Sequence, residues 1–205
     1  MNALDHLVIA APDLETGTVW FTDRTGLRLA PGGQHVTMGT HNRLLGLGED
    51  AYLEIIAIDP DAAPPAHPRW FDLDRPLDAT GLRTWVVRCD DLDAALAVAP
   101  PGSGVARDFA RGDLRWRMAV PENGRLPFDN LFPALIEWQT EAHPAPRLPD
   151  SGARLRELTL IHPRADALRV ALSAVLDDPL VSVRMGGRQA MAATLDTPTG
   201  PRELG

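Results

Sequence analysis

Two polar residues interrupt apolar segments near the amino terminus, and both have side chains that could move a proton. Glu54 lies within YLEIIAI and His6 lies within LDHLVIAA. If these segments are strands, their side chains alternate between the two faces of the sheet, and Glu54 and His6 each share a face with apolar neighbours. A half-buried carboxylate is costly unless it is hydrogen-bonded, ion-paired or bound to a metal. A neutral His6 that donates to Glu54 would satisfy both groups and would make a usable general base.

The elements that carry these residues follow the order strand, helix and three strands. The expected ranges are a strand at 3–11, a helix at 14–25, and strands at 27–31, 40–47 and 52–58. Asp13 can cap the helix and Gly26 can end it. The proline-rich segment 60–76 is expected to cross to a second unit without contributing to the core.

A second unit repeats the first, since residues 82–87 align with residues 4–9. A helix is expected at 92–99 and strands at 105–110, 114–120 and 133–139. Thr84 stands at the position of His6. Glu137, in PALIEWQ, is expected to repeat Glu54, so His6, Glu54 and Glu137 are predicted to share one cavity as the catalytic residues.

A third, incomplete unit is expected after a linker, with a strand at 155–161, a helix at 164–176 and strands at 180–185 and 189–196. Only residues 202–204 remain for a fourth strand. The predicted fold class is therefore α+β, with two tandem modules, 3–59 and 81–140, paired into an open curved sheet. They form a domain over 1–140, on which a partial third module at 152–205 packs.

Composition narrows the classes of function. The formal charge is −8, which argues against a nucleic-acid partner, and no apolar run is long enough to span a membrane. All 20 basic residues are arginines, so mechanisms that need a lysine are excluded. The single cysteine, Cys89, agrees with a reducing cytoplasm. We expect a small-molecule partner, and a homodimer is an assembly that the sequence leaves open.

The duplicated unit, with His6 on a first strand and Glu54 on a fourth, resembles the vicinal oxygen chelate superfamily. GGQHVTMGTHNRLLGLG followed by YLEIIAID resembles its glyoxalase-like domain subgroup. The resemblance covers roughly residues 3–140. It implies a cup-shaped cavity in which a divalent metal takes a ligand from each first and each fourth strand, here His6, Thr84, Glu54 and Glu137.

Threonine binds such metals poorly, so we expect no tightly bound cofactor. A loosely bound divalent metal, if there is one, would use His6, Glu54 and Glu137. Asn42 is predicted to face the cup and bind the substrate, but the opposite strand phase would instead make His41 a fourth ligand.

Three further residues are candidates for substrate binding. Thr84 lies at the first-strand position of the second unit, and Arg115 and Arg117 share a strand face. The arginines would either be solvated, clamp a carboxylate or pair with Glu137. His35 and His143 are expected at the surface.

Two functions remain. One is a lyase, isomerase or dioxygenase-like enzyme that acts on a small oxygenated molecule, with Glu54 or His6 moving a proton. The alternative is a protein of the same fold that binds or sequesters a small ligand without chemistry.

Overall fold

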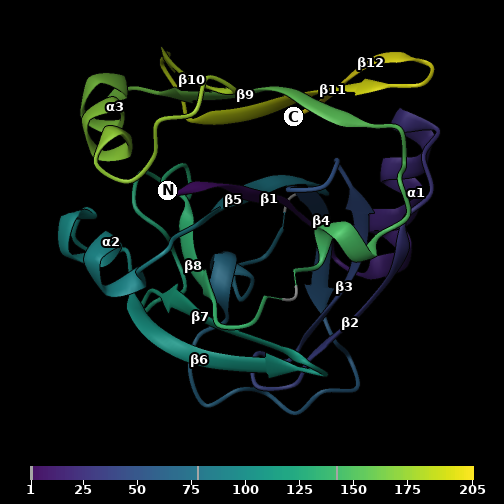
Figure 1. Ribbon diagram of the computed structural model, residues 1–205, viewed down its shortest axis with the longest axis horizontal. Coiled ribbons are helices and arrows are strands. Elements are labelled where there is room, and N and C mark those ends of the chain that lie inside the picture. The colour runs from purple at the N-terminus through teal and green to yellow at the C-terminus, as the bar shows by residue number, and fades with distance from the viewer. Residues whose placement is uncertain (1, 78, 142) are drawn as a thin grey trace.

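The computed structural model describes residues 2–77, 79–141 and 143–205, which form two sheets and three α-helices (Figure 1). The first module holds β1 (Ala3–Ala10), α1 (Leu14–Thr25), β2 (Ala30–His35), β3 (Thr40–Gly46) and β4 (Tyr52–Ile58). The second holds β5 (Gly81–Arg88), α2 (Leu92–Val98), β6 (Val105–Arg111), β7 (Leu114–Val120) and β8 (Ala134–Trp138). The carboxyl-terminal part holds β9 (Arg154–His162), α3 (Ala165–Ser173), β10 (Val181–Met185), β11 (Ala190–Thr197) and β12 (Gly200–Leu204).

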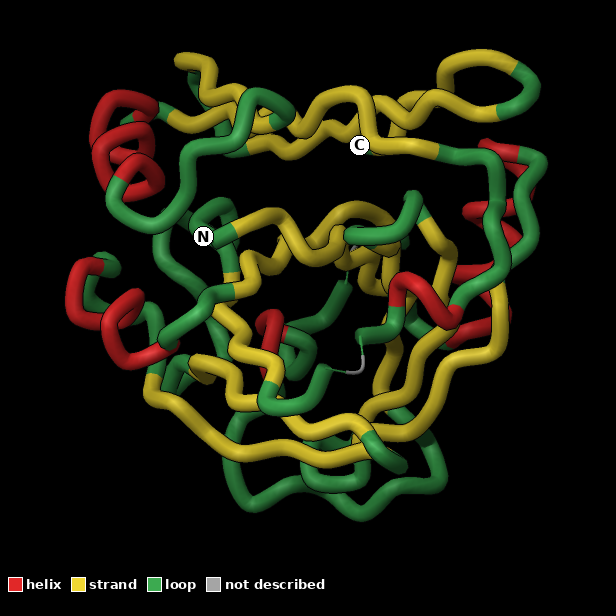
Figure 2. The backbone as a smooth tube through the Cα atoms, in the orientation of Figure 1, coloured by secondary structure: helices red, strands yellow, loops and turns green. Residues whose placement is uncertain are grey.

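The two modules form one eight-stranded sheet in the order β2-β3-β4-β1-β5-β8-β7-β6. The first strand of each module pairs in parallel with the fourth, and β1 pairs antiparallel with β5 at the junction. The sheet curls, so the two edge strands β2 and β6 approach each other (Figure 2). The predicted pairing of two modules into an open curved sheet is therefore confirmed.

The first helix is capped by Asp13 and ended by Gly26, as the sequence predicted. The Asp13 side chain accepts a hydrogen bond from the Thr16 amide at 2.7 Å, and Gly26 ends the helix with a φ of 72°. The strand predicted at 27–31 instead begins at Ala30 and continues to His35. The strand pairs with β3 on both sides of an irregularity between Pro31 and Gln34, which contains the two glycines at 32 and 33.

The carboxyl-terminal strands form a separate sheet in the order β10-β9-β11-β12. Its chain order is the same as in the first two modules, but its pairing is not. Here the first strand, β9, pairs in parallel with β10, which directly follows the helix. A full strand, β12, also stands where only a stub at 202–204 was expected, because residues 200–204 pair with β11.

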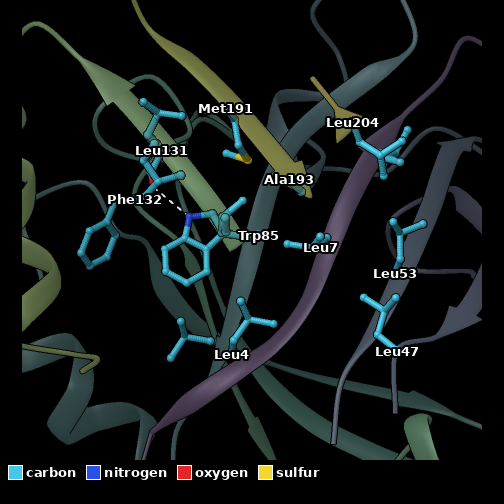
Figure 3. Packing of buried hydrophobic residues seen from close by; sticks show 14 of the residues in the cluster. Leu4, Leu7, Leu47, Leu53, Trp85, Leu131, Phe132, Met191, Ala193 and Leu204 are labelled. Carbon is cyan, nitrogen blue, oxygen red and sulfur yellow. Dashed lines mark hydrogen bonds between the residues drawn. The ribbon is translucent and has the colours of Figure 1, made fainter. Parts of the chain in front are cut away.

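One hydrophobic core joins the two sheets. Trp85 of β5 is fully buried at its centre, and its indole donates to the Leu131 carbonyl at 2.9 Å. Figure 3 shows Met191 and Ala193 of β11 packed over Trp85 together with Leu7 of β1. The convex face of the curled sheet is therefore covered by the second sheet.

A second core fills the inside of the curl. It combines aliphatic side chains with aromatic and sulfur-containing ones, and the latter are Met38, Trp70, Phe71, Phe109, Trp116 and Met118. Trp70 and Phe71 come from segment 60–76, which connects the two modules as predicted, but the expectation that it would not contribute to the core is wrong. The apolar sequence WFDL within this segment turns inward, and Phe71 adopts a left-handed φ of 59°. Arg83 holds the turn by donating to the Phe71 carbonyl at 2.9 Å.

Candidate functional site

A β-bulge in β1 directs two adjacent side chains into the cup. Leu4 pairs with Val87 and His6 pairs with Val86, so Asp5 is an extra residue without a partner on β5. A bulge of this kind breaks the alternation of faces. Asp5 and His6 therefore lie side by side, and their side chains are 0% and 4% exposed.

The imidazole of His6 lies between two carboxylates. Its Nδ1 atom is 2.6 Å from Oδ1 of Asp5, and its Nε2 atom is 3.6 Å from Oε2 of Glu54. The ring stacks on Tyr52, with centroids 4.4 Å apart. Asp5 also accepts hydrogen bonds at 2.9 Å from Trp138 and from His143. These contacts fix the orientation of the His6 ring from both sides.

Asn42 faces the cup, as the predicted strand phase required, and there it holds the other oxygen of Glu54. Its amide nitrogen donates to Oε1 of Glu54 at 2.5 Å, and its amide oxygen accepts from the Gly33 amide at 2.8 Å. A side chain at Gly32 would overlap that amide oxygen. The double glycine thus lets β2 approach Asn42 closely.

Arg111 reaches the same group of residues from the opposite edge of the sheet. Its Nη1 atom lies 3.3 Å from the Asn42 amide oxygen and 3.2 Å from Nε2 of His35. His35 is buried, and its Nδ1 atom is 3.1 Å from the Thr40 hydroxyl. Arg111 therefore links β6 to β2 and β3.

The charges of the site follow from these contacts. Burial alone would lower the pKa of His6, but the hydrogen bonds and charges of Asp5 and Glu54 outweigh it and raise the pKa to about 9. Burial would raise the pKa of Glu54, yet His6 and Asn42 hold it below its ordinary value. Burial lowers the pKa of His35 to about 4. At neutral pH the site contains an imidazolium, two carboxylates, a neutral His35 and the Arg111 cation.

A small cavity of about 30 Å³ opens beside these groups. That volume holds about two water molecules, because one needs roughly 10–15 Å³ by the same measure. The lining combines the polar groups His6, His35, Asn42, Tyr52, Glu54 and Arg111 with the apolar groups Leu44, Trp70, Phe71, Trp116, Met118, Ile136 and Trp138. A compact ligand fits this space more readily than a long one.

Glu137 does not reach the cavity, so its expected convergence with His6 and Glu54 is wrong. Arg115 and Arg117 do not line the cavity either; of the alternatives left open for them, Arg117 adopts the pairing with Glu137. Glu137 accepts from the Leu92 amide at 2.9 Å and lies 3.3 Å from Arg117, on the outer side of the sheet. Arg117 also binds Asp93 of α2, and Arg115 is exposed. The inward residues of β7 and β8 are instead their neighbours in sequence, such as Trp116 and Trp138.

The true counterpart of Glu54 in the second module is Ala134. Val8 pairs with Glu54 in the first module, and Val86, which aligns with Val8, pairs with Ala134 in the second. Glu137 lies three residues beyond that register. The short match between YLEII and LIEWQ had therefore aligned the wrong positions.

These residues do not fit the divalent metal that the superfamily resemblance implies. Thr84 is fully buried, with its hydroxyl 3.5 Å from the Trp85 carbonyl oxygen, and Ala134 has no donor atom. His6 is already bound to Asp5, and Glu54 to Asn42. Within the described ranges, no group of three or more His, Cys, Asp or Glu side chains is arranged to hold a metal ion.

Several site residues were missed or misplaced by sequence reasoning. Asp5 was missed because a bulge leaves no sign in the sequence. His35 and His143 were expected at the surface but line the cavity or contact Asp5, respectively. Arg111 was missed because only the curl of the sheet brings it to Asn42. The double glycine before His35 was the one available signal for a close approach in this region.

The profile of the family described as "Glyoxalase-like domain" matches residues 4–176. The chain belongs to this family. The match also confirms the resemblance to the vicinal oxygen chelate superfamily that the sequence suggested.

One solved structure of low identity shares the fold of this glyoxalase-like protein. A hypothetical protein from Staphylococcus aureus matches with a TM-score of 0.60 at 12% identity, covering 92% of this chain and 88% of that one. Methylmalonyl-CoA epimerase from Mycobacterium tuberculosis matches at 23% identity, with a TM-score of 0.41 and 66% and 85% coverage.

A variant of the Streptomyces coelicolor epimerase, in complex with 2-nitronate-propionyl-CoA, matches at 15% identity with a TM-score of 0.45 and coverage of 67% and 97%. No curated protein matches the sequence. No helix in the described part of the chain is long and apolar enough to cross a membrane.

Proposed function

We propose that this glyoxalase-like protein catalyses proton transfer on a small carbonyl compound, as an isomerase or lyase, without the help of a metal. The observation that carries the proposal is the pair formed by Glu54 and His6. Their nearest oxygen and nitrogen atoms are 3.6 Å apart, and they hold opposite charges at neutral pH. A base and an acid thus stand together beside a largely apolar cavity.

The chemistry expected of this pair needs no oxidant and no other reactant. Glu54 would take a proton from a carbon next to the carbonyl group, and the electrons of the broken C–H bond would pass to the carbonyl oxygen. The His6 imidazolium and the Arg111 guanidinium would stabilise the resulting enolate. Return of the proton to the same or the opposite face would complete an isomerisation, and loss of a leaving group would complete an elimination.

The test is proton exchange at carbon. Small 2-oxo acids, 2-hydroxy acids and hydroxyketones would be incubated with the protein in D₂O, and loss of the C–H signal would be followed by NMR. We expect exchange of at least one compound to be accelerated by the wild type and to fall by at least about 100-fold in Glu54→Gln. Glu137→Gln, on the outer side of the sheet, is the matched control and should keep the activity.

A second function, binding of a small ligand without chemistry, is supported by the same site. Both Glu54 oxygens already face a polar side chain, and the cavity is small. Affinity for a compound that undergoes no exchange in wild-type protein, and whose affinity is unaffected by Glu54→Gln, would favour this alternative.

A further inference from the structure

Two donors at the cavity lack the partners that buried donors normally have. Trp70 is only 3% exposed, and its indole nitrogen is buried and makes no hydrogen bond within the described residues. Buried donors are rarely left without an acceptor, because desolvation is then uncompensated. Trp70 lines the cavity, so a bound molecule can supply the missing acceptor.

Arg111 is the second donor, and the partner that it lacks is a counter-charge. It is half-buried and lines the same cavity, and its contacts are the neutral groups of Asn42 and His35. No carboxylate of the described residues lies within ion-pair distance of it. A partly buried guanidinium is stabilised most by an anion that accepts two parallel hydrogen bonds.

We propose that the missing group is the carboxylate of a small 2-oxo or 2-hydroxy acid, bound by Arg111 and the Trp70 indole. The inference rests on the proposed function, since it names the substrate class of the same site. The anion at this end would leave the 2-oxygen of the acid for His6 and its proton-bearing carbon, C3 of a 2-oxo acid or C2 of a 2-hydroxy acid, for Glu54. Binding would also neutralise Arg111, the one positive group of the site without a counter-charge in the described residues.

The shape of the cavity favours a carboxylate over a tetrahedral anion. The rings of Trp116 and Trp138 border it. The Trp70 ring contacts the His35 ring edge to face, with centroids 5.0 Å apart. Flat aromatic walls suit a planar group of few atoms. With about 30 Å³ available, a larger acid would require Trp70 and Phe71 to move.

Titration calorimetry with paired probes tests the proposal. Pyruvate and lactate would be compared with their neutral amides, pyruvamide and lactamide, and with inorganic phosphate. We expect at least one acid to bind at least about tenfold more tightly than its amide and than phosphate. Trp70→Phe, which keeps an aromatic ring but loses the N–H, and Arg111→Gln should each weaken acid binding by roughly ten- to a hundredfold.

Control measurements separate a loss of binding from a loss of folding. Arg115→Gln, an exposed arginine of the outer face, should leave the affinity for the acid unchanged. Equal thermal unfolding and circular dichroism of Trp70→Phe and the wild type would show that the cup remains intact. If Trp70→Phe unfolds more readily, Arg111→Gln alone must show the loss.

The outcomes also separate this inference from the proposed function. Glu54→Gln should bind the acid at least as tightly as the wild type, because it removes a negative charge, while it loses proton exchange. Retained exchange in Glu54→Gln contradicts the proposed function and leaves the anion site standing. Equal affinity for acid and amide, tighter binding of phosphate, or no binding of either acid at millimolar concentration overturns the anion site.

Discussion

Asp5 and His6 are consecutive residues of one strand, yet their side chains meet, with Oδ1 of Asp5 2.6 Å from Nδ1 of His6. The bulge in β1 makes this contact, and it determines the charge of the site. Without Asp5, only Glu54 would oppose the effect of burial, so the pKa of His6 would be lower. Asp5 is thus a positioning residue that acts through His6.

Replacing Asp5 by Asn tests this relationship. The side chain keeps its size, but the His6 imidazolium loses its nearest counter-charge. We expect the free energy of unfolding, measured in urea, to fall by about 3–5 kcal/mol, which is the usual cost of removing one partner of a buried ion pair. The NMR titration of the His6 ring should also shift to lower pH. Asp113→Asn, in an exposed pair with Arg147, is the control and should leave both measurements unchanged.

The stability of the protein should depend on pH through His6. The folded pKa of about 9 lies above the ordinary value of 6.5, so the folded state binds the proton more tightly than the unfolded chain. The stabilisation is complete below pH 6.5 and is lost as the pH rises through about 9, with a total on the order of 3 kcal/mol. Urea unfolding across this range should show the decline in the wild type. His6→Gln should flatten it, and an unchanged slope in that variant would contradict the assignment.

The second module lacks metal ligands at the two positions that correspond to His6 and Glu54, and introducing ligands there should create a metal site. Thr84→His combined with Ala134→Glu supplies four ligands from the first and fourth strands of both modules. At a zinc concentration 100-fold above Kd, the double variant should be stabilised by about 2.7 kcal/mol, seen as a zinc-dependent rise in the unfolding temperature. Each single variant controls for overpacking of the filled cup. A rise of the same size in the wild type would show that its own residues suffice.

The fold could be predicted well from sequence because its signals are local. The strand containing Glu54, the helix capped by Asp13 and the repeat of the opening strand depend on alternation, capping and alignment of neighbouring residues. The inward orientation of Asn42 followed from the same reasoning about the phase of β3, but Asn42 was expected to bind a substrate, and its hydrogen bond to Glu54 was not predicted.

The rest of the site depends on register and curvature, which the sequence does not display. The sequence alignment was wrong by three residues along β8. It placed Glu137 in the cup, whereas the structure has Ala134 at that position and the Glu137 carboxylate on the outer face. Arg111 and Trp70 enter the site only after the sheet curls and the segment between the modules folds into it. Such contacts join residues far apart in the chain, so no pattern of adjacent residues records them.

The most direct test of the central claim is the rate of carbon proton exchange in D₂O before and after treatment with a strong chelator, with metal content measured in the same samples. We expect the chelated, metal-free wild type to exchange its substrate as fast as the untreated protein, while Glu54→Gln is inactive in both states. Exchange that disappears on chelation and returns on addition of zinc, nickel or manganese would contradict it.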